Sequence, residues 1–346
     1  EVEVEEGRKE GSRSQNEKQM VSQDKSYIRH RFDDLDDRGG VGCKFQCQTY
    51  WAKQFAALRL CYFKEPDEAD GFLRSLATSK SWATQGGKSG ASFSKSSDDR
   101  LVIKCISRVE LQMFLEFAPA YFEYMANVFY HSLPTLLCKI LGVYTIRYDN
   151  RETGRKMLEN VVVMENIFYQ RSVTRTFDLK GSSRARYVDI GKGESFDEAL
   201  RRRRAERRAG KRRSETQVER VSQVLLDDNL MELTRGRPFP LKHRAKLFFH
   251  TAVQNDTLFL SIVNVVDYSI LAGFDENGHQ IVVGIIDYLR QYDIIKKMER
   301  MGKSVGMIAG QAEPTIIQPS QYRKRFSLAM ERYFMTIPDK WISHEA

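Results

Sequence analysis

One lysine and two aspartates stand where a charged side chain is costly unless it finds a partner or does chemistry. Lys104 ends the apolar run LVIK, Asp267 follows two valines in VVDYSIL, and Asp287 follows the apolar run IVVGII. A buried ammonium can pair with phosphate oxygens or a carboxylate. An aspartate can accept a proton from a hydroxyl or hold Mg²⁺ beside phosphates. Each residue also has an ordinary interpretation: a lysine extending from an edge strand, or an aspartate capping a turn.

A glycine-rich segment, GGKSGASF, precedes Lys104. Glycines let the backbone approach a phosphate, and free N–H groups can cradle it. Such a segment is more often only a turn between strands, and the spacing of a Walker loop is absent. Followed by a strand lysine and two aspartates, however, it matches the order of parts in kinases. The candidate phosphate-binding residues here are Gly86, Gly87, Lys88, Ser89 and Gly90.

Two further segments carry charges in a suggestive pattern. In TFDLKGS, Asp178 and Lys180 alternate with apolar residues and share one face of an expected strand, where the lysine could contact phosphate. An internal pair of these two residues is the alternative. After Asp287, apolar and basic residues separate onto opposite sides of a helical wheel, which suits an anionic membrane surface or an ordinary surface helix. The basic residues are Lys296, Lys297, Arg300 and Lys303.

Composition limits what kind of protein this is. The chain has 346 residues, 41% hydrophobic and 29% charged, an ordinary globular balance, and no window resembles a membrane span. The net charge is +9, but residues 201–213 contribute eight of these charges, so a basic nucleic-acid-binding body is not expected. Five cysteines without a CxxC pair favour a reduced, cytosolic chain. Because the chain begins at Glu1, we expect a piece of a longer protein.

Positioning these residues requires both strands and helices. Apolar and β-branched runs predict strands over 44–50, 101–103, 141–148, 160–164, 173–179 and 281–286. Helical spacing predicts helices ending near 60 and over 68–77, 109–117, 119–130, 243–263 and 320–333. Residues 1–26 and 191–222 are polar and charged, which predicts a disordered linker and a solvated insertion. The sequence therefore predicts an α+β protein of two lobes.

Eight motifs in order resemble the phosphatidylinositol phosphate kinase family, and most of all its phosphatidylinositol-3-phosphate 5-kinase (PIKfyve-like) branch. They are GGKSGASF, DDRLVIK, FLEFAPAYFEYM, VVVMENIF, TFDLKGS, VVDYSIL, GIIDYL and YRKRFSLAMERYFMTIPDKW. The resemblance implies a bilobal, kinase-like catalytic domain over residues 27–340, with an antiparallel-sheet N-lobe (about 27–165) and a mixed C-lobe (about 166–340). ATP would bind between the lobes. The branch pattern does not include the 191–222 insertion.

The resemblance also implies roles. Asp267 would be the acid-base residue, Asp287 the Mg²⁺ ligand, and Asp178 and Lys180 would lie in the active cleft. Lys104 would contact ATP phosphates, with a helix glutamate as its partner, for which Glu110 fits better than Glu116. Met164, Glu165 and Asn166 would form the hinge near adenine. Residues 288–319 would be the activation loop that meets the membrane.

The expected reaction is ATP- and Mg²⁺-dependent phosphorylation of the 5-hydroxyl of phosphatidylinositol 3-phosphate in an anionic membrane. The chain would work in the cytoplasm, peripherally on endosomal or vacuolar membranes, with regulatory scaffold proteins as possible partners and no nucleic acid. Two alternatives stay open: activity on phosphatidylinositol 4-phosphate, or a non-catalytic scaffold that binds phosphoinositides. A nucleic-acid-binding role for the Arg-rich run is less favoured, because such runs are more often solvated loops, localisation signals or membrane tethers.

Overall fold

The computed structural model describes residues 15–35, 41–63, 66–82, 92–151, 153–182, 186–188, 224–275, 280–293 and 317–338. Three features named above lie outside these ranges. They are the phosphate-loop candidates Gly86 to Gly90, the Arg-rich insertion 191–222, and the basic residues Lys296, Lys297, Arg300 and Lys303. The expectations attached to them stay predictions.

The N-terminal half is built on a seven-stranded antiparallel sheet with the order β1-β2-β6-β7-β5-β4-β3. Its strands are β1 (Ile28–Leu35), β2 (Val41–Tyr50), β3 (Ser79–Trp82), β4 (Phe93–Ser96), β5 (Leu101–Ile106), β6 (Ile140–Asn150) and β7 (Lys156–Glu165). Strand β5, which carries Lys104, lies between β4 and β7, so its backbone is held on both sides.

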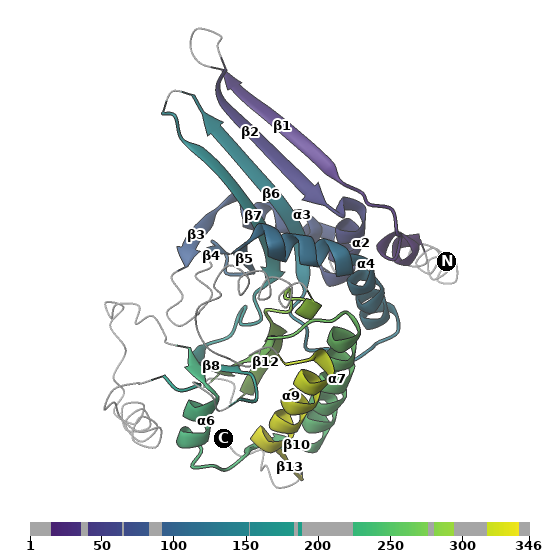
Figure 1. The fold of residues 1–346 in the computed structure, drawn as a ribbon, viewed down its shortest axis with the longest axis vertical. Coiled ribbons are helices and arrows are strands. Elements are labelled where there is room, and N and C mark those ends of the chain that lie inside the picture. Colours follow the sequence, from purple (N-terminus) through teal and green to yellow (C-terminus); the bar gives the residue numbers. More distant parts are fainter. Residues whose placement is uncertain are drawn as a thin grey trace, which may run out of the picture.

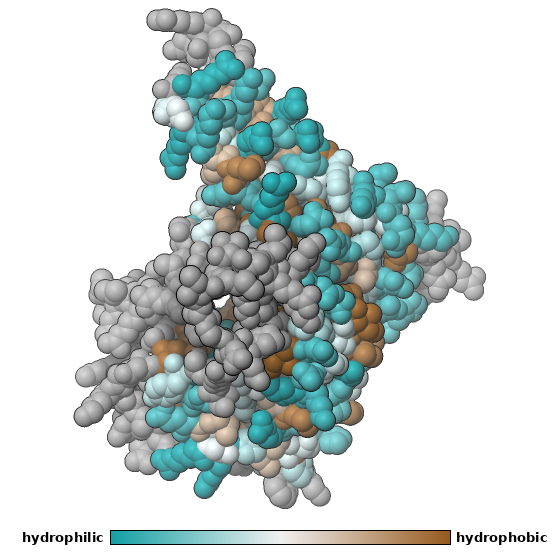
Figure 2. Space-filling view, viewed as in Figure 1, coloured by the Kyte–Doolittle hydropathy of each residue, from teal (hydrophilic) through white to brown (hydrophobic). Residues whose placement is uncertain are grey.

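Three helices gather at the base of this sheet: α2 (Ala52–Tyr62), α3 (Pro66–Ala77) and α4 (Arg108–Tyr130). Strands β1, β2, β6 and β7 project beyond them as a long arm (Figure 1). The side of the arm seen in Figure 2 is mostly hydrophilic. The buried apolar side chains of this half, such as Phe55 of α2, Leu101 of β5 and Phe114 of α4, lie in the part that the helices cover.

The C-terminal half contains a four-stranded mixed sheet, β12-β11-β8-β9, and a two-stranded parallel sheet, β10-β13. The strands are β8 (Val173–Leu179), β9 (Leu225–Leu226), β10 (Phe239–Lys242), β11 (Ser269–Asp275), β12 (Gln280–Ile286) and β13 (Phe334–Ile337). Helices α7 (His243–Ile262) and α9 (Pro319–Tyr333) lie side by side in Figure 1, and α6 (Asp227–Leu233) follows β9. The expected α+β class, with an antiparallel first sheet and a mixed second sheet, is confirmed.

The segment after α4 joins the two halves. Leu137 forms a parallel bridge with Ile285 of β12, and the Cys138 N–H donates to the Ile285 carbonyl at 2.9 Å. Buried residues of both halves belong to one apolar core, including Phe114 and Tyr121 of α4 and Leu289 after β12. This junction brings the end of β12 beside the first sheet.

Two expectations about elements are wrong. Residues 15–20, expected within a disordered linker, are helical: Met20 is fully buried, and the Asn16 amide donates to the Ala57 carbonyl at 3.0 Å. Two helices were expected on either side of Pro119, but α4 runs through it without a break. Flanking residues such as Phe117 and Phe122 are buried, and their packing outweighs the backbone hydrogen bond that proline lacks.

Candidate functional site

Lys104 and Asp287 form an ion pair although they come from different sheets. Their Nζ and Oδ1 atoms are 2.6 Å apart, and Lys104 is only 4% exposed. Burial by itself would raise the pKa of Asp287, but the Lys104 ammonium, helped by Lys180 and Arg290, holds that pKa below its usual value. The carboxylate side chain is still 41% exposed. An anion entering here would meet a fixed cation beside a charged carboxylate.

Asp267 is held by two cations. Its Oδ1 lies 2.5 Å from Lys180 Nζ, which also donates to the Asp267 carbonyl at 2.8 Å. Its Oδ2 accepts from Arg290 Nη1 at 3.0 Å. The same two cations, Lys180 and Arg290, help to lower the pKa of Asp287, so the two aspartates share one electrostatic environment.

Both aspartates have strained backbones. Asp267 has φ +66° and Asp287 has φ +61°, in the left-handed region that aspartate visits at a cost. Asp267 lies just before β11 and Asp287 directly after β12, and these two strands pair through Ser269 and Ile286. The antiparallel pairing therefore puts both carboxylates at the same edge of the sheet. Strained residues of this kind cluster at functional sites.

Glu110 has a different role from the one expected. Its carboxylate caps α4, accepting from the Ser107 N–H at 2.8 Å, and its other oxygen lies 3.8 Å from Arg290 Nε. The ion pair of Lys104 is with Asp287, so the expectation of Glu110 as its partner is wrong. Arg290 instead joins the first turn of α4 to Asp267.

Asp178 and Lys180 do not pair with each other in the described residues. The Asp178 carboxylate lies 3.0 Å from Arg186, and Arg186 Nε is 2.8 Å from Asp227 Oδ2. Sequence reasoning missed Arg186, Asp227 and Arg290. A visible signal for Asp227 was an acid directly after the apolar pair Leu225–Leu226, the pattern that singled out Asp267 and Asp287.

The expected adenine hinge joins the two halves. Met164 and Glu165 end β7, and the Glu165 carboxylate pairs with Lys139 at 3.0 Å. Asn166 is buried, its amide donating to the Asp99 carbonyl at 2.7 Å and its side-chain oxygen accepting from the Phe168 N–H at 3.1 Å. These side chains fix the path of the chain and leave Met164 partly buried against the core.

The glycine-rich motif is described only at its end. Phe93 opens β4, pairs with Lys104 across the sheet, and has its ring 5.9 Å from Lys104 Nζ. The last residue of the glycine-rich motif therefore lies beside Lys104 in the candidate site.

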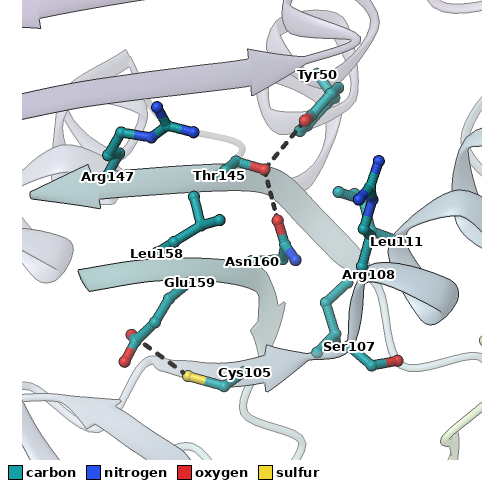
Figure 3. A pocket seen from close by; sticks show the side chains of 11 residues that line it. Tyr50, Cys105, Ser107, Arg108, Leu111, Thr145, Arg147, Leu158, Glu159 and Asn160 are labelled. Carbon is teal, nitrogen blue, oxygen red and sulfur yellow. Dashed lines mark hydrogen bonds between the residues drawn. The ribbon is translucent and has the colours of Figure 1, made fainter. Parts of the chain in front are cut away.

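A separate pocket of about 640 Å³ lies on the sheet where α4 begins (Figure 3). Tyr50, Thr145 and Asn160 form a hydrogen-bonded row on its floor, and Cys105, next to Lys104 in the strand, lies 3.7 Å from Glu159 at its side. None of the sequence-predicted site residues lines it.

Within the described ranges, no group of three His, Cys, Asp or Glu side chains could hold a metal unaided, and no helix could span a membrane.

Comparison with known proteins shows the family of the chain. A family model described as Phosphatidylinositol-4-phosphate 5-Kinase (PIP5K) matches residues 76–282 and 274–333. The chain is 39% identical over 302 residues to the 1-phosphatidylinositol 3-phosphate 5-kinase of Homo sapiens, covering 87% of this chain and 13% of that protein. It is 40% identical over 308 residues to the 1-phosphatidylinositol-3-phosphate 5-kinase FAB1A of Arabidopsis thaliana, covering 88% and 16%.

A third relative, the 1-phosphatidylinositol 3-phosphate 5-kinase FAB1 of Saccharomyces cerevisiae, is 36% identical over 329 residues, covering 94% of this chain and 13% of that protein. The chain thus spans only a small part of the length of these curated relatives. The matched segments include Lys104, Asp178, Lys180, Asp267 and Asp287. The chain belongs to the PIP5K family of phosphoinositide kinase domains.

Proposed function

We propose that the chain transfers the γ-phosphoryl group of ATP to the inositol 5-hydroxyl of phosphatidylinositol 3-phosphate, giving phosphatidylinositol 3,5-bisphosphate. The observation that carries this proposal is that the named relatives, at 36–40% identity over most of the chain, are all 3-phosphate 5-kinases. Kinase family membership implies ATP as the donor. The convergence of Lys104, Lys180, Asp267 and Asp287 supports a phosphate-transfer site between two kinase-like lobes.

Asp267 would accept the proton of the lipid hydroxyl as the oxygen attacks phosphorus. Its carboxylate is 43% exposed, so it can reach a substrate. Lys180 and Arg290 hold its two oxygens and so fix the direction of the carboxylate. Lys180 could turn from Asp267 to the transferred phosphoryl group, because both are anionic and lie at one site. Lys104 would neutralise charge on the ATP phosphates.

Mg²⁺ fits the donor set around Asp287. Mg²⁺ prefers oxygen ligands and commonly takes one or two carboxylates together with substrate phosphates. Asp287 is a charged, partly exposed carboxylate, so it suits such a shared site. When bound there, the metal would supply positive charge against the ATP phosphates. Asp178, whose carboxylate lies 3.0 Å from Arg186, is a further acid that we assign to the cleft.

The remaining parts of the proposal concern ligand and membrane contacts. Met164, Glu165 and Asn166 would flank adenine, and Gly86, Gly87, Lys88, Ser89 and Gly90 would cradle the phosphates. Lys296, Lys297, Arg300 and Lys303 would meet the anionic surface of endosomal or vacuolar membranes. The phosphate-loop glycines and their neighbours, and the four basic residues, lie outside the described residues.

Product analysis tests the proposal. The purified chain is incubated with ATP, Mg²⁺ and separate vesicles of phosphatidylinositol 3-, 4- or 5-phosphate, and the products are separated by chromatography. We expect 3,5-bisphosphate from the first vesicles, and a loss of product in Asp267→Asn with an unchanged melting temperature. Near-normal turnover in that variant would contradict the role of Asp267.

A second candidate is phosphorylation of phosphatidylinositol 4-phosphate, which the description of the matching family model favours. A 4,5-bisphosphate product in the same experiment would select it. A non-catalytic phosphoinositide-binding scaffold would yield no product from any vesicle, and an ATP titration with Mg²⁺ would then detect no nucleotide binding.

A further inference from the structure

Asp227 is a buried carboxylate with an unusual set of donors. It is 1% exposed and begins α6 directly after β9, which pairs in parallel with β8 through Phe177 and Asp178. A carboxylate this deeply buried is costly unless several donors satisfy its oxygens. It therefore needs a structural or functional explanation.

Four donors from three segments of the chain satisfy Asp227. The backbone N–H groups of Lys180 and Gly181 donate to its Oδ1 at 3.1 and 2.7 Å. Arg186 Nε donates to Oδ2 at 2.8 Å, and the hydroxyl of Tyr333 donates to Oδ1 at 2.9 Å. Two of the four bonds are to the backbone of the DLKG motif, so Asp227 fixes that backbone directly.

Asp227 and helix α9 together restrain the backbone at Lys180 and Gly181. Strand β8 ends at Leu179, so the sheet itself does not hold Lys180. Gly181 has φ +68°, and a Cβ there would lie 2.6 Å from the Ala329 side chain of α9. The Lys180 main chain is thus set by Asp227 on one side and by the packing of α9 against Gly181 on the other. From this position its Nζ reaches Asp267 at 2.5 Å.

We propose that Asp227 is a positioning residue that holds the backbone of Lys180 so that its ammonium meets Asp267, and that Tyr333 couples the end of α9 to this arrangement. The inference rests on the proposed function, because it gives Lys180 a task at the reacting phosphoryl group. Asp227 itself touches no substrate in this account. It acts through Lys180, by limiting the directions in which the ammonium can point.

Tyr333→Phe tests this with the smallest change, because it removes one hydroxyl from a buried ring. Tyr124→Phe is the matched control: its hydroxyl also donates to a buried aspartate, Asp256, at 2.6 Å, away from Lys180. With phosphatidylinositol 3-phosphate vesicles, we expect Tyr333→Phe to lower kcat by roughly fivefold to tenfold. This is less than the full effect of losing one hydrogen bond to a charged group, because the three other donors to Asp227 remain. KM for ATP should stay within about twofold, since only a transition-state contact is loosened.

A second measurement does not depend on activity. The rate at which an acylating reagent modifies Lys180 is followed by mass spectrometry, with Lys139 in the same digest as reference, because its own partner is Glu165. We expect faster modification of Lys180 in Tyr333→Phe and faster still in Asp227→Asn, with Lys139 unchanged. If Tyr124→Phe has the same effect on Lys180, or if Tyr333→Phe leaves both kcat and labelling unchanged, the inference is overturned.

The two failures are distinguishable. Wild-type chain that phosphorylates no lipid would refute the proposed function, while the labelling rates would still decide whether Asp227 positions Lys180. If Asp227→Asn does not fold, Tyr333→Phe alone tests whether Asp227 positions Lys180.

Discussion

Lys180 Nζ lies 2.5 Å from Asp267 Oδ1, although 87 residues separate the two in the chain. The contact exists because β8 and β11 are neighbours in the mixed sheet, with Leu179 paired to Ile270. Lys180 directly follows β8, and Asp267 comes shortly before β11. The strand register thus brings the end of one strand to the start of the other, and an ammonium to a carboxylate.

Replacing Lys180 should separate activity from stability. Lys180→Met keeps the length of the side chain but removes its charge, so we expect kcat on phosphatidylinositol 3-phosphate to fall roughly a hundredfold or more. Its side chain is 19% exposed and Arg290 still neutralises Asp267, so the free energy of unfolding should change by only about 1 kcal/mol. Steady-state kinetics and denaturant unfolding measure both. A large stability loss with normal kcat would contradict the assignment.

The Lys104–Asp287 pair should show coupling in unfolding experiments. Asp287→Asn leaves a 4%-exposed ammonium without its carboxylate, which should cost about 1–2 kcal/mol once the exposure of Asp287 is allowed for. The double variant Lys104→Met/Asp287→Asn should be more stable than Asp287→Asn alone, because no unpaired buried charge remains. If the changes in free energy of unfolding caused by Lys104→Met and Asp287→Asn simply add in the double variant, the two residues do not interact.

Asp256 should give stability a distinctive pH dependence. It is buried in α7 and accepts from Tyr124, Thr135 and the Leu136 N–H, each at 2.6 Å. Burial, only partly offset by these donors, raises its pKa from 3.8 to about 6. The folded state therefore binds the proton more tightly than the unfolded state. The contribution of Asp256 to the free energy of unfolding should therefore fall as the pH rises. The whole loss is about 3 kcal/mol, of which about 2 kcal/mol falls between pH 4 and pH 6, and the contribution is level above about pH 7.

Comparison of wild type with Asp256→Asn isolates this effect, since all other titrating groups are shared. Denaturant unfolding at several values between pH 4 and pH 7.5 should give a difference between the two proteins that changes over this window and is flat above it. A difference that is constant from pH 4 to pH 7.5 would contradict the raised pKa.

Gly181 and Gly154 form a matched pair of glycines. Both have positive φ, +68° and +67°, but a Cβ on Gly181 would lie 2.6 Å from Ala329 while one on Gly154 would meet nothing within 4 Å. Gly154→Ala should therefore cost about 1 kcal/mol from the backbone alone. Gly181→Ala should cost about 2–4 kcal/mol and displace α9, lowering activity as well. Thermal and denaturant unfolding measure the stability of both variants. If Gly181→Ala and Gly154→Ala lose the same stability, α9 does not pack tightly against Gly181.

The sequence by itself determined the elements whose patterns are strong and local. The apolar run that ends at Lys104 forms β5, the run before Asp287 forms β12, and the helical spacing of 243–263 forms α7 almost to its ends. Strand and helix periodicity depend on which side of an element is buried, and neighbouring residues record that directly. The resemblance of eight motifs to one kinase family identified the family.

Only the tertiary structure decided which charged groups meet. Lys104 pairs with Asp287 and not with Glu110, and Arg290 and Asp227 hold the site although no motif singled them out. Helix α4 continues through Pro119 because its buried faces are packed on both sides of the ring. Ion pairs between residues 87 or 183 positions apart depend on strand order and register. These are properties of the whole chain, and a local pattern contains no record of them.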